Sequence, residues 1–492
     1  MNKRKLKLTG IAGAVALALT GCGGSDGPAN LAPTAQAVTI DKVRNWLPVQ
    51  GNFVVADANG DQLKISAITE NGSAVSPVQG IYTLQNGLLT VTGTTFSYLP
   101  LKDAATTFSY TVSDARLSAT STVALALPDS DPLAYQQWHL RNTGQKAYSQ
   151  NSAAIRAFLI EDQKYTESQA DAWLVANVPE NASVPGEDMN VAAAYAQGVT
   201  GEGSIAVVVD SGLELEHEDL AANILPNRSL NMINGAINVT DPTSTAALGD
   251  HGTSVAGLIA AAGWNGMGGR GVAPEAKLIG MNFIQAQTDL NNAIGHGVPG
   301  SGISPSDPIA VFNRSYGLSY PALQSVDEIS EGLQKYSVTV LRNGLGALTT
   351  KSSGNSFRNA GVAWAGSVCE EAKELGLTCL NSNFEPSQTT PYYISVGAVN
   401  ADGTHTSYST AGANLFVSAP AGEYGDLEPA MVTTDQMTCL RGYSSFPYIQ
   451  AGSSPAADRA LTPFIYPGHA ENQNCNYTST FNGTSSAAPN AA

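Results

Sequence analysis

Three short motifs carry an acid, an imidazole and a hydroxyl, each beside small residues. Asp210 ends an apolar run and precedes Ser-Gly, His251 opens His-Gly-Thr-Ser-Val-Ala-Gly, and Ser485 lies within Gly-Thr-Ser-Ser-Ala-Ala-Pro. A serine nucleophile needs a base to accept its proton, and that base needs a carboxylate to fix its tautomer and stabilise the imidazolium. These residues can fill the three roles in the order Asp, His, Ser. Gly-Thr-Ser alone is common in turns, so the motifs carry weight only together.

Two further motifs follow apolar runs and supply groups that such a nucleophile requires. Asn355, in Ser-Ser-Gly-Asn, can donate its amide to a developing oxyanion beside the backbone N–H of Ser485. Ser315, Tyr316 and Gly317 form a strand end that can pair with an extended substrate backbone.

The elements that must position these residues are apolar runs alternating with helix-length segments from residue 128 onward. The pattern predicts a doubly wound α/β domain with buried, mostly parallel strands. In such a sheet the site lies at the carboxyl ends of the strands. An apolar stripe from Leu323 to Val340, ending at Gly344, predicts a helix. The strand candidates are 204–209, 277–281, 309–312, 348–350 and 393–397.

Residues 30–127 have a different pattern, in which short alternating runs are broken by turn residues. This predicts a small all-β sandwich in front of the α/β domain, which spans 128–492 and begins with a linker, 128–132. The stretch Asp57-Ala-Asn-Gly-Asp61 can ligate calcium through clustered oxygens or form a hydrogen-bonded polar turn, and the turn is preferred. The strand candidates are 53–55, 80–84, 88–91, 95–98, 108–112 and 121–125.

The N-terminus predicts export. Basic residues precede an apolar run from Ile11 to Leu19, followed by Thr-Gly-Cys22, which is the pattern of a signal segment over residues 1–22. The sequence around Cys22 resembles the bacterial lipobox, so we expect lipidation of Cys22, a flexible tether over 23–29, and an outer-membrane or cell-surface lipoprotein that touches the membrane only through its lipid. An ordinary secretory signal is the alternative. The net charge of −17 argues against nucleic acid as a partner.

Four cysteines follow the signal segment, and an even number in an exported chain suggests two disulfides. Three connectivities are possible, and proximity favours Cys369 with Cys379 and Cys439 with Cys475. Free buried thiols are the alternative.

Taken together, residues 131–492 resemble the subtilase superfamily of serine proteases, and more narrowly its kexin/furin branch. The N-terminal module is similar to the cadherin-like or immunoglobulin-like modules of bacterial surface proteins. The resemblance implies a subtilisin-like α/β domain and a calcium-stabilised serine endopeptidase that hydrolyses polypeptides with the Asp210, His251, Ser485 triad and Asn355. The motifs that carry it are Asp131-Pro132 with 137–140, 190–191 with 198–201, 210–214 with 217–220, 342–346 and 433–435.

The resemblance also implies a structural calcium ion. Oxygen ligands on a glycine-rich loop suit Ca²⁺. The matching positions are the side chains of Asp131, Asp219 and Asn265 and the backbone carbonyls of Ala262, Met267 and Gly269.

Departures from the kexin/furin pattern are also present. Positions that are acidic in that branch are Ser211, Tyr320, Gly361 and Thr410 here, so we expect no second calcium site and no strict cleavage after paired basic residues. A nearby acid such as Asp250 or Glu370 can still favour a basic residue before the scissile bond. No inhibitory pro-domain of the family type is evident, so folding can require a dedicated chaperone, or the sandwich can be a spacer.

Two other functions compete with the endopeptidase. One is a catalytically weak or inactive surface binding or adhesion protein built on a protease fold, and the intact motifs speak against it. The other is a different serine hydrolase, which the Asp, His, Ser order and the absence of Gly-x-Ser-x-Gly around Ser485 disfavour. The chain stops at Ala492, about two turns into the helix expected to carry Ser485. We therefore expect more of the domain to follow, and we expect this short helix to hold Ser485 poorly.

Overall fold

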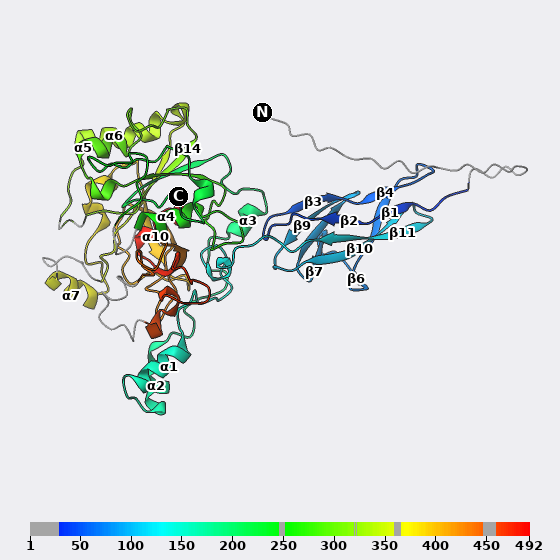
Figure 1. The fold of residues 1–492 in the computed structure, drawn as a ribbon, viewed down its shortest axis with the longest axis horizontal. Coiled ribbons are helices and arrows are strands. Elements are labelled where there is room, and N and C mark those ends of the chain that lie inside the picture. The colour runs from blue at the N-terminus through cyan, green and yellow to red at the C-terminus, as the bar shows by residue number, and fades with distance from the viewer. Residues whose placement is uncertain (1–28, 246–250, 319, 321, 359–365, 446–458) are drawn as a thin grey trace, which may run out of the picture.

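The structure, a computed structural model, describes residues 29–245, 251–318, 320, 322–358, 366–445 and 459–492. An elongated all-β domain leads into a larger α/β domain (Figure 1), so the predicted fold class is confirmed. The signal segment with Cys22, most of the tether, Asp250 and Gly361 lie outside the described residues.

The all-β domain is built from two main sheets that face each other across an aromatic core. Along β10 (Thr106–Ser113) every second side chain is buried, including Phe108 and Tyr110, which pack near Phe53 and Phe96. All six predicted strands are present. Five others were missed: the short strands at 34–36, 38–40, 49–52 and 73–75, and β5 (Lys64–Glu70), whose alternation is interrupted by a bulge opposite β10. The sheet orders are β2 (Val38–Ile40), β11 (Ser118–Leu125), β10, β5, β6 (Ser73–Val75); β3 (Val49–Asn52), β9 (Thr95–Pro100), β8 (Gly87–Thr92), β7 (Ile81–Leu84); and β1 (Thr34–Gln36) with β4 (Val54–Ala56). The strands of the two main sheets are antiparallel except where β2 pairs with β11.

The α/β domain contains a six-stranded, fully parallel sheet. Its order reverses at β12, because β13 lies on one side of β12 and β14 on the other, and such a reversal opens a crevice at the carboxyl ends of the strands. All five predicted strands are present, whereas edge strand β17 was missed although its sequence, Leu-Phe-Val-Ser-Ala-Pro, is largely apolar; Phe416 is exposed at this edge of the sheet. The order is β13 (Lys277–Met281), β12 (Ile205–Val209), β14 (Ile309–Arg314), β15 (Leu348–Ser352), β16 (Ile394–Val399), β17 (Leu415–Pro420), and β18 (Met431–Thr434) pairs separately with β19 (Tyr477–Phe481).

The helix predicted from the apolar stripe exists but begins later than its first apolar residues. It is α6 (Glu328–Thr339), and Asp327 caps it by accepting hydrogen bonds from the backbone N–H groups of Ile329 and Ser330. Leu323 therefore precedes the helix and is exposed. The other helices are α1 (Ser152–Glu161), α2 (Glu167–Asn177), α3 (Val191–Tyr195), α4 (His251–Ala260), α5 (Asp289–Ile294), α7 (Gly366–Glu374) and α10 (Thr484–Ala491). Helices α1 and α2 form a pair that projects from the large domain (Figure 1).

A loop of the all-β domain docks onto the large domain through Trp46. Arg270, from the loop after α4, lies between the rings of Trp46 and Trp264, with its guanidinium carbon 5.2 and 4.8 Å from the ring centroids. The Arg270 Nη2 and the Trp264 indole N–H both donate to Asn45. The predicted linker also takes part, since the Asn45 N–H donates to the Asp129 carbonyl. The two domains are therefore joined by a buried interface and not by a free tether.

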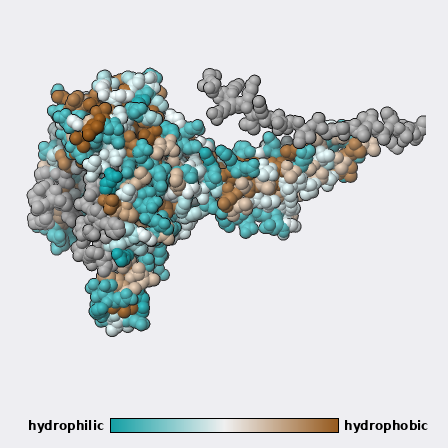
Figure 2. All heavy atoms as spheres, viewed as in Figure 1, coloured by the Kyte–Doolittle hydropathy of each residue, from teal (hydrophilic) through white to brown (hydrophobic). Residues whose placement is uncertain are grey.

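Apolar side chains gather on the surface of the large domain over α5 and α6 (Figure 2). Leu290 of α5 and Ile329 of α6 are both largely exposed. Among the described residues, no helix is long and apolar enough to cross a membrane.

Candidate active site

The acid and the imidazole form a hydrogen-bonded pair at the point where the sheet order reverses. Asp210 follows β12 and is fully buried, and its Oδ1 accepts from His251 Nδ1 at 2.8 Å and from the Ser211 N–H at 2.7 Å. His251 is the first residue of α4, and its side chain is partly exposed. Because Nδ1 is held by the carboxylate, Nε2 is the ring nitrogen left to act as a base.

Helix α4 can approach Asp210 closely because residue 252 is glycine. A Cβ at Gly252 would lie 1.9 Å from the Gly212 carbonyl oxygen and 3.0 Å from the Asp210 Cβ. The remaining residues of α4 are buried, so the helix cannot shift to relieve a larger side chain. The ring of Phe481 lies edge-on to the imidazole, with centroids 5.2 Å apart, and limits its rotation.

Ser485 is the second residue of α10, two residues after a backbone turn at Gly483. Gly483 has φ +83°, and its N–H donates to the hydroxyl of the buried Tyr408 at 3.0 Å. The Ser485 hydroxyl donates to the Ser315 carbonyl at 3.0 Å, and Ser315 Oγ donates back to the Ser485 carbonyl at 2.8 Å. The predicted nucleophile and the predicted substrate strand are thus tied to each other.

The expectation that α10 would be poorly anchored is wrong. The helix packs against β16 and β17 with Ala487 and Ala488 fully buried. Asn490 Nδ2 donates to the Pro420 carbonyl at 2.9 Å. Small side chains let the helix lie close to the sheet, so it does not need a wide apolar face.

Asn355 is held in the orientation that an oxyanion donor requires. Its Oδ1 accepts from both the N–H and the hydroxyl of Thr484, at 2.8 and 2.9 Å. The amide nitrogen therefore remains to donate. Asn355 is exposed and lines the same cavity as Ser485.

That cavity, of about 360 Å³, lies beside the nucleophile. It is lined by Tyr316 and Gly317 of the predicted substrate strand and by Glu385. Sequence reasoning missed Glu385 and its partner Lys351, which lies within β15 (Leu-Thr-Thr-Lys-Ser), although a lysine in a buried strand is rarely without a partner. Glu370, one of the acids considered instead, is exposed on α7 and does not line the cavity.

The side chains predicted to bind calcium come together. Asp219 Oδ1 accepts from Asn265 Nδ2 at 2.7 Å, whereas Asp219 Oδ2 is buried and has no hydrogen-bond partner among the described residues. Asp131 is already compensated, because its Oδ2 accepts from Arg270 Nε at 2.7 Å and both side chains are fully buried. Burial raises the pKa of Asp219. The unpartnered Asp219 oxygen fits a cation, while the Asp131 end is occupied by Arg270.

Both disulfides have the connectivity that proximity favoured. Cys369 is bonded to Cys379, beside the cavity residue Leu380, and Cys439 is bonded to Cys475, near β19.

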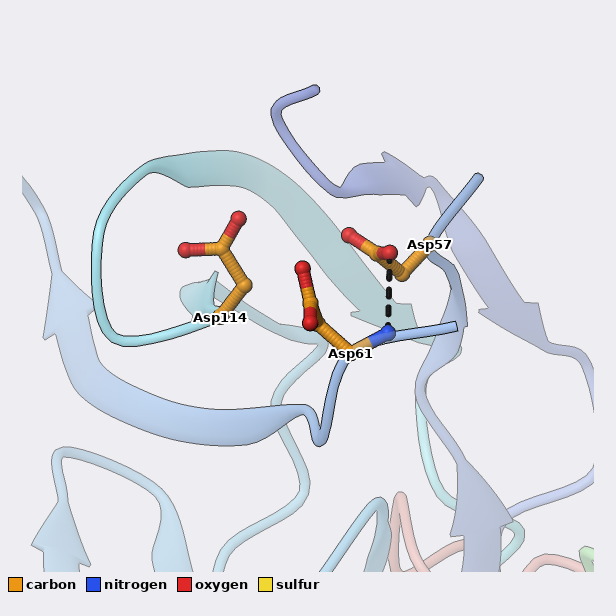
Figure 3. Close-up of side chains that lie close together, drawn as sticks. All are labelled: Asp57, Asp61 and Asp114. Atoms are coloured by element: carbon orange, nitrogen blue, oxygen red, sulfur yellow. Dashed lines mark hydrogen bonds between the residues drawn. The ribbon is translucent and has the colours of Figure 1, made fainter. Parts of the chain in front are cut away.

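A separate carboxylate cluster lies in the all-β domain, where Asp57, Asp61 and Asp114 face one another (Figure 3). Asp57 Oδ1 accepts from the N–H groups of Asn59 and Asp61 at 2.8 and 3.1 Å. These bonds are those of the polar turn preferred from the sequence.

A parallel α/β domain that presents an Asp–His pair, a serine at a helix N-terminus and an oriented asparagine defines a class, the subtilisin-type serine hydrolases. The family model described as "Subtilase family" matches residues 201–492, and the chain belongs to this family. A second family model, "Bacterial Ig domain", matches residues 30–126.

Curated relatives are about one third identical to this chain over the regions that align. An "Aeromonas extracellular serine protease" from Aeromonas sobria is 33% identical over 379 residues, covering 76% of this chain and 52% of that protein. Human furin is 33% identical over 190 residues, 36% of this chain and 22% of furin. A crystal structure of the A. sobria protease with "the chaperone (ORF2)" aligns with a TM-score of 0.57 at 31% identity, covering 74% of this chain and 53% of that one. The chain thus spans about half the length of the curated Aeromonas relatives that it matches.

Proposed function

We propose that this chain carries the catalytic residues of a subtilase serine endopeptidase that hydrolyses peptide bonds in polypeptides. The observation that carries the proposal is the Asp210–His251 hydrogen bond of 2.8 Å beside a serine and an oriented asparagine. These four residues come from distant parts of the sequence, and a dispensable site would not be expected to retain all of them.

In the proposed mechanism, His251 Nε2 accepts the Ser485 proton as Oγ attacks the substrate carbonyl. The Ser485 hydroxyl must first turn from the Ser315 carbonyl to His251, and such contacts often tighten only when substrate binds. Asp210 keeps Nδ1 protonated and stabilises the imidazolium, which then gives its proton to the leaving amine. Water repeats the sequence to release the acyl group.

The negative charge that develops on the substrate oxygen would be stabilised by two donors. One is Asn355 Nδ2, since Thr484 holds the other end of the amide. The second is the Ser485 N–H at the start of α10, where the backbone N–H groups lack partners within the helix.

We further propose a structural calcium ion at Asp219 and Asn265, with the carbonyls of Ala262, Met267 and Gly269. The buried, unpartnered Asp219 oxygen supports a cation there. The ion would tie the loop that follows α4 to the turn that carries Asp219, which stabilises the helix bearing His251. Asp131 contributes little charge to this site because Arg270 already compensates it.

We also propose that the protein is exported as a lipoprotein through Cys22, that it belongs to the kexin/furin branch of the family, and that it folds with a dedicated chaperone. The A. sobria relatives support the last of these, because one of them is crystallised with a chaperone. Their description as extracellular supports export.

Labelling with a fluorophosphonate probe tests the proposed function. The full chain should label, and labelling should be lost in Ser485→Ala and His251→Ala. Ser486→Ala is the matched control, because among the described residues its hydroxyl bonds to the Gly483 carbonyl alone, and labelling should persist. Asn355→Ala should lower kcat by about 10²–10³-fold, the loss known for the oxyanion asparagine of subtilisin. A folded protein that never labels would refute the proposal.

A further inference from the structure

The cavity beside Ser485 has the position expected for the substrate side chain that precedes the scissile bond. Ser485, Thr484 and Asn355 line it, together with segments 316–318 and 352–356. A peptide paired with residues 315–317 would place that side chain in the cavity. This assignment rests on the proposed endopeptidase function.

Glu385 is the sole charged side chain among the described residues that line the cavity. Its carboxylate already has three partners, because Oε1 accepts from Ser387 Oγ at 2.9 Å, Oε2 accepts from Gln388 Nε2 at 2.6 Å, and Lys351 Nζ lies 3.2 Å from Oε1. The carboxylate is therefore largely saturated before any substrate arrives.

Lys351 is a buried cation that lies behind the cavity wall, against Glu385. Its side chain is 2% exposed, and Nζ also donates to the Tyr316 carbonyl of the substrate strand. Burial lowers the pKa of Lys351, and Glu385 opposes that effect. A Cβ at Gly317 would lie 2.5 Å from Glu385 Oε2 and 2.7 Å from Lys351 Nζ, so the pair packs directly under the strand.

We propose that Lys351 neutralises Glu385 and thereby makes this cavity select an uncharged, apolar or aromatic side chain before the scissile bond. An arginine or lysine there would have to displace Lys351 from Glu385 or lie close to a second buried cation. An acidic side chain would lie close to the Glu385 carboxylate, and Lys351 could not compensate it because Lys351 is already paired with Glu385. Leu318, Leu380 and Tyr320 offer apolar contact to an uncharged side chain.

The test compares kcat/KM of the full chain on peptide p-nitroanilides that differ only in the last residue: Phe, Leu, Gln, Arg or Glu. We expect wild type to prefer Phe or Leu over Arg by 10-fold or more. Lys351→Met keeps the chain length but frees Glu385, and it should raise the Arg/Phe ratio by 10-fold or more. Glu385→Gln leaves Lys351 alone and should raise the Glu/Phe ratio. The double variant should again prefer Phe or Leu, and this result would show that the charges, and not the shape of the cavity, cause the changes in the single variants.

Lys335→Met, on the exposed face of α6, is the matched control and should change neither ratio. Fluorophosphonate labelling of each variant confirms that the site is assembled, and the double variant decides the question if a single one fails to fold. A labelled wild type that prefers Arg, or a labelled Lys351→Met with an unchanged ratio, would overturn the inference while leaving the proposed function intact. A wild type that never labels would overturn both.

Discussion

Replacement of Arg270 by methionine removes a buried cation without removing much volume. In the structure the guanidinium donates to Asp131 at 2.7 Å and to Asn45 Oδ1 at 2.7 Å, and both members of the Arg270–Asp131 pair are fully buried. After the replacement, the Asp131 carboxylate keeps only the backbone N–H groups of Trp264 and Asn265 as donors. The cost of leaving a buried charge uncompensated in this way is about 3–5 kcal/mol.

Urea unfolding followed by tryptophan fluorescence measures this cost. A chelator is present so that no divalent ion can compensate the Asp131 charge in place of the guanidinium. The double variant Asp131→Asn with Arg270→Met should recover most of the loss, because it removes both charges together. Arg156→Met is the control, since its ion pair with Asp171 is solvent-exposed and should be worth less than about 1 kcal/mol. If Arg270→Met costs no more than Arg156→Met, Arg270 does not compensate Asp131.

Three further outcomes are expected. Burial lowers the pKa of His139 to about 3, so its neutral form is favoured in the fold. Stability should be intact above about pH 6.5 and fall by up to about 1.4 kcal/mol per pH unit toward pH 3. His139→Leu should flatten this acid slope in urea titrations. Tyr408→Phe removes the acceptor of the buried Gly483 N–H and should cost about 1–3 kcal/mol, with lower kcat if Ser485 shifts. A normal kcat and unchanged midpoint would contradict that role. Chelator should lower the melting temperature of wild type, and Asp219→Asn should abolish the difference; an equal chelator effect in both would place the ion elsewhere.

The residues proposed to be catalytic could be selected from the sequence because each is marked by its local context. Asp210 follows an apolar run, and His251 and Ser485 have small neighbours at the starts of helices. The buried parallel strands were also predictable, because both faces of such a strand require apolar side chains and the sequence therefore shows a continuous apolar run. Strand β5 was not predicted, because a bulge interrupts the alternation that identifies a strand, and edge strand β17 was missed although its sequence is largely apolar.

The start of α6 shows how a local polar contact can override an apolar pattern. Leu323 belongs to the same apolar stripe as the later residues, yet the helix begins only after Asp327, whose side chain caps its N-terminus. The anchoring of α10 was misjudged for a different reason. Its alanines provide little apolar area, but close contact with the sheet compensates for their size.

By itself, the sequence determined the family of this chain and the residues proposed as acid, base, nucleophile and oxyanion donor, each in a local context that encodes its own turn or helix start. Only the tertiary structure decided which charges meet. Lys351 and Glu385 are 34 residues apart, Asp131 and Arg270 are 139 apart, and Asn45 and Arg270 are 225 apart. Pairs at such separations leave no periodic or motif signal, because their contact depends on how the sheet, its loops and the two domains pack. The selectivity proposed for the cavity and the strength of the domain interface both depend on these pairs.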